Sequence, residues 1–229
     1  MTQQQPSLSN AENPSVELTT WGVGPWQGEW PTDENGILDP VLDPELLANG
    51  DSRNVLDKYR YWNMAAIVAD LDVRRHGFHV AIENWQHDLN IGSIVRTANA
   101  FLAAEVHIIG NKRWNRRGAM VTDRYQHVRH HPTVEDFVAW CATAGTDGGP
   151  LPVIAIDNVP GCKQIEKYSL PQQCVLVFGQ EGPGLSDAAI AASEVVLEIT
   201  QFGSTRSINA SAAAAITMHT WVMQHVFAG

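Results

Sequence analysis

The stretch from Cys174 to Ser186, CVLVFGQEGPGLS, joins an apolar run to a loop that contains three glycines and one proline. The apolar run predicts a buried strand, and the glycines indicate a backbone that approaches another group closely. A tight strand-to-helix turn would explain the glycines and the proline without any ligand. Glu181, in the middle of the loop, would repel a phosphate but suits the hydroxyl, amine or cationic groups of a ligand.

Similar apolar runs alternate with helical patterns on both sides of this stretch. Strands are expected at 78–84, 105–110, 152–158, 174–179 and 194–200, and helices at 54–70, 90–103, 133–145, 185–192 and 207–227. Strands that are apolar along most of their length and separated by helices are typical of a parallel sheet covered on both faces. The sequence therefore predicts an α/β fold.

The composition is that of one substantial domain with an appendage: the chain has 229 residues, of which 44% are hydrophobic. No apolar run approaches the ~18 residues of a membrane-spanning helix, and the first ten residues lack the features of a signal peptide. Cys141, Cys162 and Cys174 are scattered without metal-ligand spacing. We therefore expect buried, reduced thiols, no metal, no membrane contact and a cytoplasmic location.

Charge is distributed unevenly along the chain. Residues 1–50 contain eight acidic side chains, no Lys or Arg, and three tryptophans, whereas 51–229 contain 17 acidic and 15 basic side chains. The net charge of −10 therefore comes mostly from the first 50 residues. We expect an acidic, Trp-containing arm at 1–50, a helical lead-in at 51–75 and the main domain at 76–229.

Basic residues concentrate in the segment 111–131, NKRWNRRGAMVTDRYQHVRHH, which holds six Lys or Arg and one acidic residue. Trp114 and Tyr125 are interleaved with them. Such a segment favours a phosphate backbone with exposed bases, although a solvated charged loop would look the same. The expected RNA-binding residues are Lys112, Arg113, Arg116, Arg117 and Arg124.

A second polar motif lies at 200–219, TQFGSTRSINASAAAAITMH, where a strand leads through a polar loop into a helix of small residues. Ser207 is expected to cap that helix. Asn209, two residues further on, is expected to present its amide to a partner. The small side chains from Ala210 to Ala215 permit very close packing, for which a second copy of the chain is one candidate.

A third motif lies at 83–101, ENWQHDLNIGSIVRTANAF. Asn90 is placed to cap a helix, and Gly92 permits close approach of another segment. Arg96 and Asn99 share one face of that helix, since they are three residues apart. A surface ion pair is the alternative role for Arg96.

In their order and spacing, the three motifs resemble the SpoU (TrmH-type) branch of the SPOUT RNA methyltransferases. They read N-x-G-x-I-x-R-T-A at 90–98, F-G-x-E-G-x-G-L-S at 178–186 and I-x-x-x-G-x-x-x-S-I-N-x-S at 199–211. The resemblance covers roughly residues 76–229. It implies methyl transfer from S-adenosylmethionine to a ribose 2′-hydroxyl of tRNA or rRNA. It also implies a homodimer and a C-terminal trefoil knot around the cofactor, a topology that ordinary chain-connection rules would not predict.

The resemblance also implies roles for individual residues. Gly179, Ile199 and Ile208 match residues that hold the cofactor, and Phe178, Gly182 and Gln201 lie beside them. The catalytic set matched by position is Arg96, which acts on the ribose hydroxyl, with Asn90, Glu181, Ser207 and Asn209.

Two questions stay open at the level of sequence: the role of Arg96 and the choice between an enzyme and a non-catalytic protein. Arg96 is either a proton acceptor or an electrostatic stabiliser of the forming alkoxide. A non-catalytic RNA-binding protein that keeps the fold is the competing function, whereas a phosphate hydrolase is excluded because no P-loop lysine is present. The chain departs from the family pattern at Thr200, where proline is usual, and at Trp85–Asp88, where proline is common. These departures affect loop shape and substrate choice.

Overall fold

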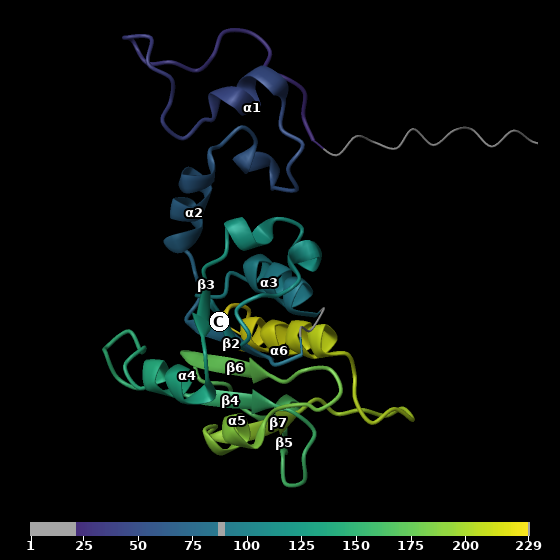
Figure 1. Cartoon of the computed structure of the whole chain (residues 1–229). Coiled ribbons are helices and arrows are strands. Elements are labelled where there is room, and N and C mark those ends of the chain that lie inside the picture. Colours follow the sequence, from purple (N-terminus) through teal and green to yellow (C-terminus); the bar gives the residue numbers. More distant parts are fainter. Residues whose placement is uncertain (1–21, 87–89, 229) are drawn as a thin grey trace, which may run out of the picture. The chain divides into compact units, whose positions relative to one another are not determined.

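The computed structural model describes residues 22–86 and 90–228, and Figure 1 shows their course. The chain forms two compact units, Met1–Tyr61 and Trp62–Gly229. Two sequence predictions concern residues outside this described part: the signal-peptide expectation concerns residues 1–10, and the departure from the family pattern at Trp85–Asp88 includes His87 and Asp88. Among the described residues, no helix is both long and apolar enough to cross a membrane.

The second unit is built on a seven-stranded sheet in which every pairing is parallel, in the order β3-β2-β1-β6-β4-β7-β5. This confirms the predicted parallel α/β sheet. Two edge strands, β3 and β5, were not predicted, because one lies in the basic segment and the other has two residues. The strands are β1 Phe78–Asn84, β2 Val106–Gly110, β3 Val128–His131, β4 Val153–Ile156, β5 Lys163–Gln164, β6 Cys174–Phe178 and β7 Val195–Glu198.

Helices cover both faces of the sheet (Figure 1). On β6, Leu176 faces a core that includes residues of α3 and α6, whereas Val175 and Val177 face a core that includes residues of α4 and α5. Both faces of the sheet are therefore buried at β6, which explains why this strand is apolar at every position. The helices of this unit are α2 Met64–Asp72, α3 Asn90–Ala100, α4 Val134–Cys141, α5 Asp187–Ala191 and α6 Ala210–His225, with 3₁₀ turns η2 Arg116–Ala119, η3 Thr122–Arg124 and η4 Ile165–Lys167.

All five predicted helices are longer than the helices observed, and three of them differ in ways that have a clear physical cause. The single helix expected at 54–70 is wrong: a short turn, η1 (Asp57–Tyr59), is followed by a break, and α2 begins after Asn63, whose side chain accepts a hydrogen bond from the Ala66 amide. Asparagine favours such caps over helix interiors, which separates the two segments. The helix expected at 133–145 ends at Cys141. The last helix begins at Ala210 and is capped by Asn209, not by Ser207.

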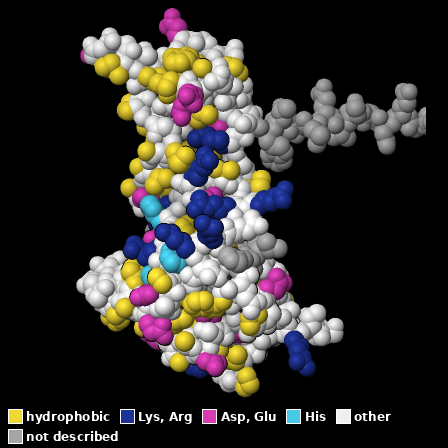
Figure 2. Space-filling view, in the orientation of Figure 1, with side chains coloured by type: hydrophobic (Ala, Val, Ile, Leu, Met, Phe, Trp, Pro, Cys, Tyr) yellow, Lys and Arg dark blue, Asp and Glu magenta, His cyan; other side chains and the backbone are white. Residues whose placement is uncertain are grey.

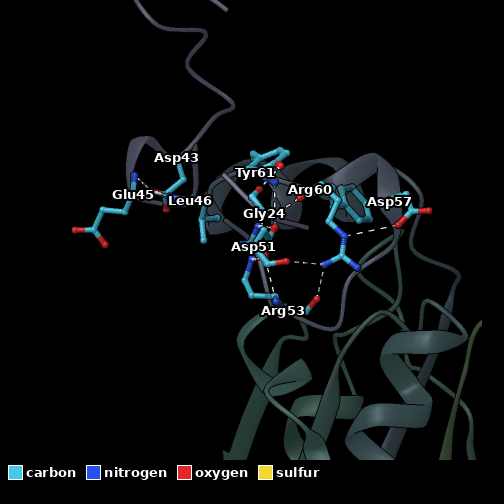
Figure 3. A network of polar contacts seen from close by, with 10 residues as sticks. Gly24, Asp43, Glu45, Leu46, Asp51, Arg53, Asp57, Arg60 and Tyr61 are labelled. Carbon is cyan, nitrogen blue, oxygen red and sulfur yellow. Dashed lines mark hydrogen bonds and ion pairs between the residues drawn. The ribbon is translucent and has the colours of Figure 1, made fainter. Parts of the chain in front are cut away.

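The first unit is organised around a buried carboxylate (Figure 3). Asp51 is fully buried and accepts hydrogen bonds from Arg53 Nε at 2.8 Å, Arg53 Nη2 at 2.7 Å and the Tyr61 amide at 3.0 Å. Burial alone would raise the pKa of Asp51, but the hydrogen bonds from Arg53 and Tyr61 outweigh it and the pKa is lowered. This unit also contains α1 (Pro44–Asn49), capped by Asp43, so part of the expected arm is folded.

Candidate functional site

The glycine loop, Gly179 to Leu185, follows β6 and folds tightly on itself. The Gln180 and Gly184 backbones exchange hydrogen bonds at 3.2 Å, and a Cβ at Gly179 would overlap the Gly184 carbonyl carbon and the Leu185 nitrogen. Gly182 and Gly184 have φ of +99° and +74°, where side chains are disfavoured. The close approach predicted for the glycines is therefore an approach of the loop to itself, as a tight turn requires.

A cavity of about 680 Å³ lies where this loop meets the residues that follow β4 and β7 and the start of α6. These strands are neighbours in the sheet, so their carboxyl ends form one edge, the usual place for a ligand in a parallel sheet. All six residues predicted to hold the cofactor line this cavity: Phe178, Gly179, Gly182, Ile199, Gln201 and Ile208. Gln201 Oε1 is buried and has no hydrogen-bond partner among the described residues.

Sequence reasoning missed several polar residues of the same cavity, among them Asp157, Asn158, Glu198 and Arg206. The Asp157 carboxylate accepts hydrogen bonds from the Leu185 amide at 2.9 Å and the Asn158 amide at 2.8 Å. Asp157 thereby fixes the end of the glycine loop. The available signal was its position, one residue after a strand that a parallel sheet can place beside β6.

Three of the predicted catalytic residues meet in one hydrogen-bonded group. Asn90 Nδ2 donates to Glu181 Oε2 at 2.9 Å, and Asn209 Nδ2 donates to Asn90 Oδ1 at 2.8 Å. Asn209 Oδ1 also accepts hydrogen bonds from the Ser211 amide at 2.9 Å and the Ala212 amide at 3.3 Å. Asn209 therefore caps α6 and orients Asn90 with the same side chain. The expectation that it lies inside the helix is wrong, but its predicted contact with a polar partner is present.

The other two predicted catalytic residues lie outside this group. Ser207 is exposed and lines the cavity. Arg96 is exposed on α3 and forms no hydrogen bond or ion pair with any residue that the structure describes. The surface ion pair considered for Arg96 is therefore not observed there. An exposed guanidinium on the helix that begins with Asn90 is available to an incoming substrate.

Glu83 connects the loops that follow β1 and β6. It is completely buried and accepts hydrogen bonds from the Ser186 amide and hydroxyl, both at 2.7 Å, and from the Trp85 indole N–H at 3.0 Å. Gln180 Oε1 adds a second link by accepting a hydrogen bond from the Trp85 amide at 3.0 Å. Buried carboxylates require such partners, so Glu83 holds both loops in register.

Thr200 stands where the family usually has proline and uses the N–H that proline lacks. Its amide and its hydroxyl each donate to the Glu166 carboxylate at 3.0 Å. Burial would raise the pKa of Glu166, but these hydrogen bonds and that of its own backbone amide outweigh it and the pKa is lowered. A polar clamp thus restrains this loop.

The basic segment, residues 111–131, is anchored at its centre and exposed around it. Figure 2 shows Lys and Arg side chains beside histidines on one face of the molecule. Of the two aromatic residues interleaved in this segment, Tyr125 is only 6% exposed and is therefore not available to exposed bases, and Trp114 is half-buried against the core. All five predicted RNA-binding side chains are exposed: Lys112, Arg113, Arg116, Arg117 and Arg124.

Three histidines form a hydrogen-bonded chain across β1, β2 and β3. His79 Nδ1 lies 3.1 Å from His107 Nε2, and His107 Nδ1 lies 3.0 Å from His131 Nε2. Burial lowers the pKa of His79 to about 4 and that of His107 well below its ordinary value. His79, Glu105 and His107 hold nitrogen and oxygen atoms within 4.8 Å of one another. Both rings already have ring partners, and the expectation of a metal-free protein stays a prediction.

The cysteines are free thiols. Cys141 and Cys174 are buried, and burial raises the pKa of each to about 12, which makes both inert. Cys162 is only partly buried, so the expectation of three buried thiols is wrong at that position.

Residues 77–219 match the model of the SpoU rRNA Methylase family. The chain belongs to this family. Among curated SpoU relatives, the tRNA (guanosine(18)-2′-O)-methyltransferase of Escherichia coli K12 is 28% identical over 171 residues, 72% of this chain and 71% of the relative. The Thermus thermophilus protein of the same name is 23% identical over 164 residues, 68% of this chain and 79% of the relative.

Solved structures of SpoU proteins share the fold. The SpoU methyltransferase AviRb from Streptomyces viridochromogenes, in complex with AdoMet, matches with a TM-score of 0.60 and 24% identity. The match covers 69% of this chain and 61% of the AviRb chain. The A. aeolicus TrmH/SpoU tRNA modifying enzyme matches with a TM-score of 0.62 and 18% identity, over 72% of this chain and 84% of the other.

Proposed function

We propose that this protein is an RNA methyltransferase that transfers the methyl group of S-adenosylmethionine to a ribose 2′-hydroxyl of tRNA. The observation that carries the proposal is the group formed by Asn90, Glu181 and Asn209 at the glycine-lined cavity. It joins residues from all three family motifs. Curated relatives named as tRNA (guanosine(18)-2′-O)-methyltransferases favour tRNA over rRNA and a guanosine as the nucleotide.

The cavity suits S-adenosylmethionine in shape and charge. A Cβ at Gly182 would have no atom within 4 Å, so the backbone there faces open space at the cavity. Ile199 and Ile208 line the cavity with apolar side chains. The buried Gln201 Oε1, which has no hydrogen-bond partner among the described residues, can accept a hydrogen bond from an amine or hydroxyl of the cofactor. Glu181 and Glu198 add negative charge that complements a sulfonium. When bound, the cofactor supplies an electrophilic methyl group.

The protein's contribution to the reaction is positioning and charge. Asn90, Glu181, Ser207 and Asn209 orient the substrate ribose at the cavity, where alignment with the cofactor can supply much of the rate. Arg96 acts on the 2′-hydroxyl. A guanidinium stays protonated at neutral pH, which favours stabilisation of the forming alkoxide over proton abstraction, and the hydroxyl proton then passes to water.

Assembly and topology follow from family membership as further proposals. We infer a C-terminal trefoil knot and a homodimer that uses α6. Ile216 and Met223 support the dimer, since both are exposed and are seven residues apart on one side of that helix. The protein acts in the cytoplasm.

The division into an acidic arm at 1–50, a lead-in at 51–75 and a catalytic domain at 76–229 is also a proposal. In it, Lys112, Arg113, Arg116, Arg117 and Arg124 bind the RNA phosphates. The compact unit Met1–Tyr61 contains ten acidic and three basic residues, so it is the appropriate piece to remove when the arm is tested. A cut after residue 50 would separate Asp51 and Arg53 from the rest of their unit.

The test supplies purified protein with labelled S-adenosylmethionine and with separate pools of unmodified tRNA and rRNA. Digestion of the RNA then identifies the methylated nucleoside. A 2′-O-methylguanosine from tRNA is the expected product. A labelled base, or label in rRNA alone, contradicts the proposal. Cofactor binding without transfer to either pool would point to a missing partner or substrate, whereas the absence of both transfer and cofactor binding would favour the non-catalytic RNA-binding protein.

A further inference from the structure

The centre of the basic segment contains a strained pair of residues. Met120 and Val121 have φ of +48° and +70°, in the left-handed region that side chains other than Gly, Asn and Asp rarely occupy. For the β-branched Val121 this is a true outlier. Such strain costs free energy and persists only where the surroundings impose it, and it concentrates at functional sites.

The surroundings of this pair do impose it. Ala119 and Thr122, which flank the pair, are buried, and the Thr122 hydroxyl donates to the Ala119 carbonyl at 2.6 Å. On the preceding turn, Asn115 accepts a hydrogen bond from the Arg117 amide at 2.9 Å. The pair is thus held at both ends.

The same segment is pressed against the helix that carries Arg96. A Cβ at Gly92 would lie 2.8 Å from the Ala119 amide nitrogen, and a Cβ at Gly118 would lie 3.0 Å from the Ser93 amide nitrogen. Only glycine permits backbones to meet this closely. Arg96 lies three residues after Ser93, one turn along α3 on the adjoining face.

The strained pair nevertheless points to solvent. Met120 is 53% exposed and Val121 is 49% exposed. The nearby side chains of Arg116, Arg117 and Arg124 are exposed as well. Met120 and Val121 thus form an apolar tip that is surrounded by cationic side chains. Single-stranded or looped RNA offers both matching features, since its phosphates are anionic and its unstacked bases have apolar faces.

We propose that Met120 and Val121 form an apolar contact for an unstacked base of the RNA substrate, while the flanking arginines bind phosphates beside it. This inference rests on the proposed function. Because the tip is fixed to α3, it sets the distance between the bound base and Arg96, and so helps to select the nucleotide that is methylated. The strain is retained because the side chains are needed at this position.

The test replaces both residues by glycine, Met120→Gly with Val121→Gly. Glycine adopts positive φ without strain, so the melting temperature should stay the same or rise. The KM for tRNA should rise about five- to tenfold, the effect of losing one favourable apolar contact. The dissociation constant for S-adenosylmethionine should not change. Val73→Ala is the matched control, because Val73 is 81% exposed and lies outside the basic segment; its KM should equal that of the wild type.

An unchanged KM for tRNA in the double variant overturns the inference, and so does a large fall in melting temperature, which would mean a structural role. A change in oligomeric state, measured by light scattering, would mean that a second copy of the chain occupies the tip and would also overturn it. If the wild type transfers no methyl group, the proposed function fails separately. The tip is then judged by the dissociation constant for tRNA, which should rise by the same factor and would overturn the inference if it did not.

Discussion

The glycine loop after β6 and the basic segment after β2 both lie at the carboxyl edge of the sheet, and both need backbone with positive φ. In the glycine loop these positions are Gly182 and Gly184, whereas in the basic segment they are Met120 and Val121. The first loop thus gains close backbone packing without strain and offers a cavity. The second keeps side chains at a cost in strain and offers a surface. In the proposed function, the cavity holds the small cofactor and the surface contacts the large RNA.

The largest expected effect is at Gly179. Gly179→Ala forces the loop open, since the new Cβ would overlap Gly184 and Leu185. We expect a loss of about 3 kcal/mol in the free energy of unfolding and loss of S-adenosylmethionine binding, measured by denaturation and calorimetry. Gly182→Ala is the control for the overlap: its Cβ meets open space, so only the strain of its positive φ remains and it should lose less stability. Equal effects of the two variants would contradict the packing described for the loop.

Removal of the charge on Glu83 comes next. Glu83→Gln presents an amide N–H₂ to a site that supplies three donors, which should cost about 2 kcal/mol. Because Ser186 and Trp85 would lose their anchor, the KM for S-adenosylmethionine should rise more than the KM for tRNA. Glu135→Gln, at an exposed position of α4, is the control. A variant with unaltered KM for the cofactor would limit Glu83 to a structural role.

Acid should destabilise β1, β2 and β3, the strands that carry the chain of three histidines. Burial holds the pKa of His79 at about 4, below the 6.5 of the unfolded chain, so the unfolded state binds the proton more readily. The free energy of unfolding is therefore highest above pH 6.5, where His79 is neutral in both states. It falls as the pH drops toward 4, by about 2 kcal/mol at pH 5. The positive charge of Arg129 lowers the pKa of His79, His107 and His131 further. Hydrogen exchange at pH 5 should therefore rise in β1, β2 and β3 before β4, and His79→Gln should reduce the loss. Uniform exchange across the sheet would contradict this cause.

The smallest expected effect concerns the acidic unit. Removal of residues 1–61 takes away a net negative charge, so tRNA binding should tighten about threefold at low salt and less at high salt, because screening shortens the range of repulsion. Filter binding across a salt series measures this. Weaker binding after deletion would show that the unit contacts RNA.

Sequence reasoning reached the strands and part of the cavity lining because their signals are local. Phe78–Asn84 forms the strand that the apolar pattern predicted, and the six residues predicted to hold the cofactor come from motifs with fixed spacing and line the cavity. Residues that act through long-range contacts were missed. Asp157 and Glu83 matter because of amides that are 28 and 103 residues away, and no local pattern reports such distances.

The strained pair was missed for a similar reason. The residue types at positions 120 and 121 do not indicate positive φ, because the conformation of Met120 and Val121 is imposed by contacts of their neighbours with α3. Asn209 was placed inside a helix because the adjoining alanine run is typical of a helix interior. Its actual position as the N-cap depends on the residue at which the preceding loop ends, and the local pattern does not show this.

The most direct test of the account concerns Arg96, measured as single-turnover methyl transfer to tRNA together with the dissociation constant for S-adenosylmethionine. Arg96 forms no hydrogen bond or ion pair with a described residue, so Arg96→Ala should fold and bind the cofactor as the wild type does. Its transfer rate should fall by about a hundredfold or more, as expected when a group that stabilises developing charge is lost. Transfer at the wild-type rate would remove Arg96 from the reaction and contradict the proposed mechanism.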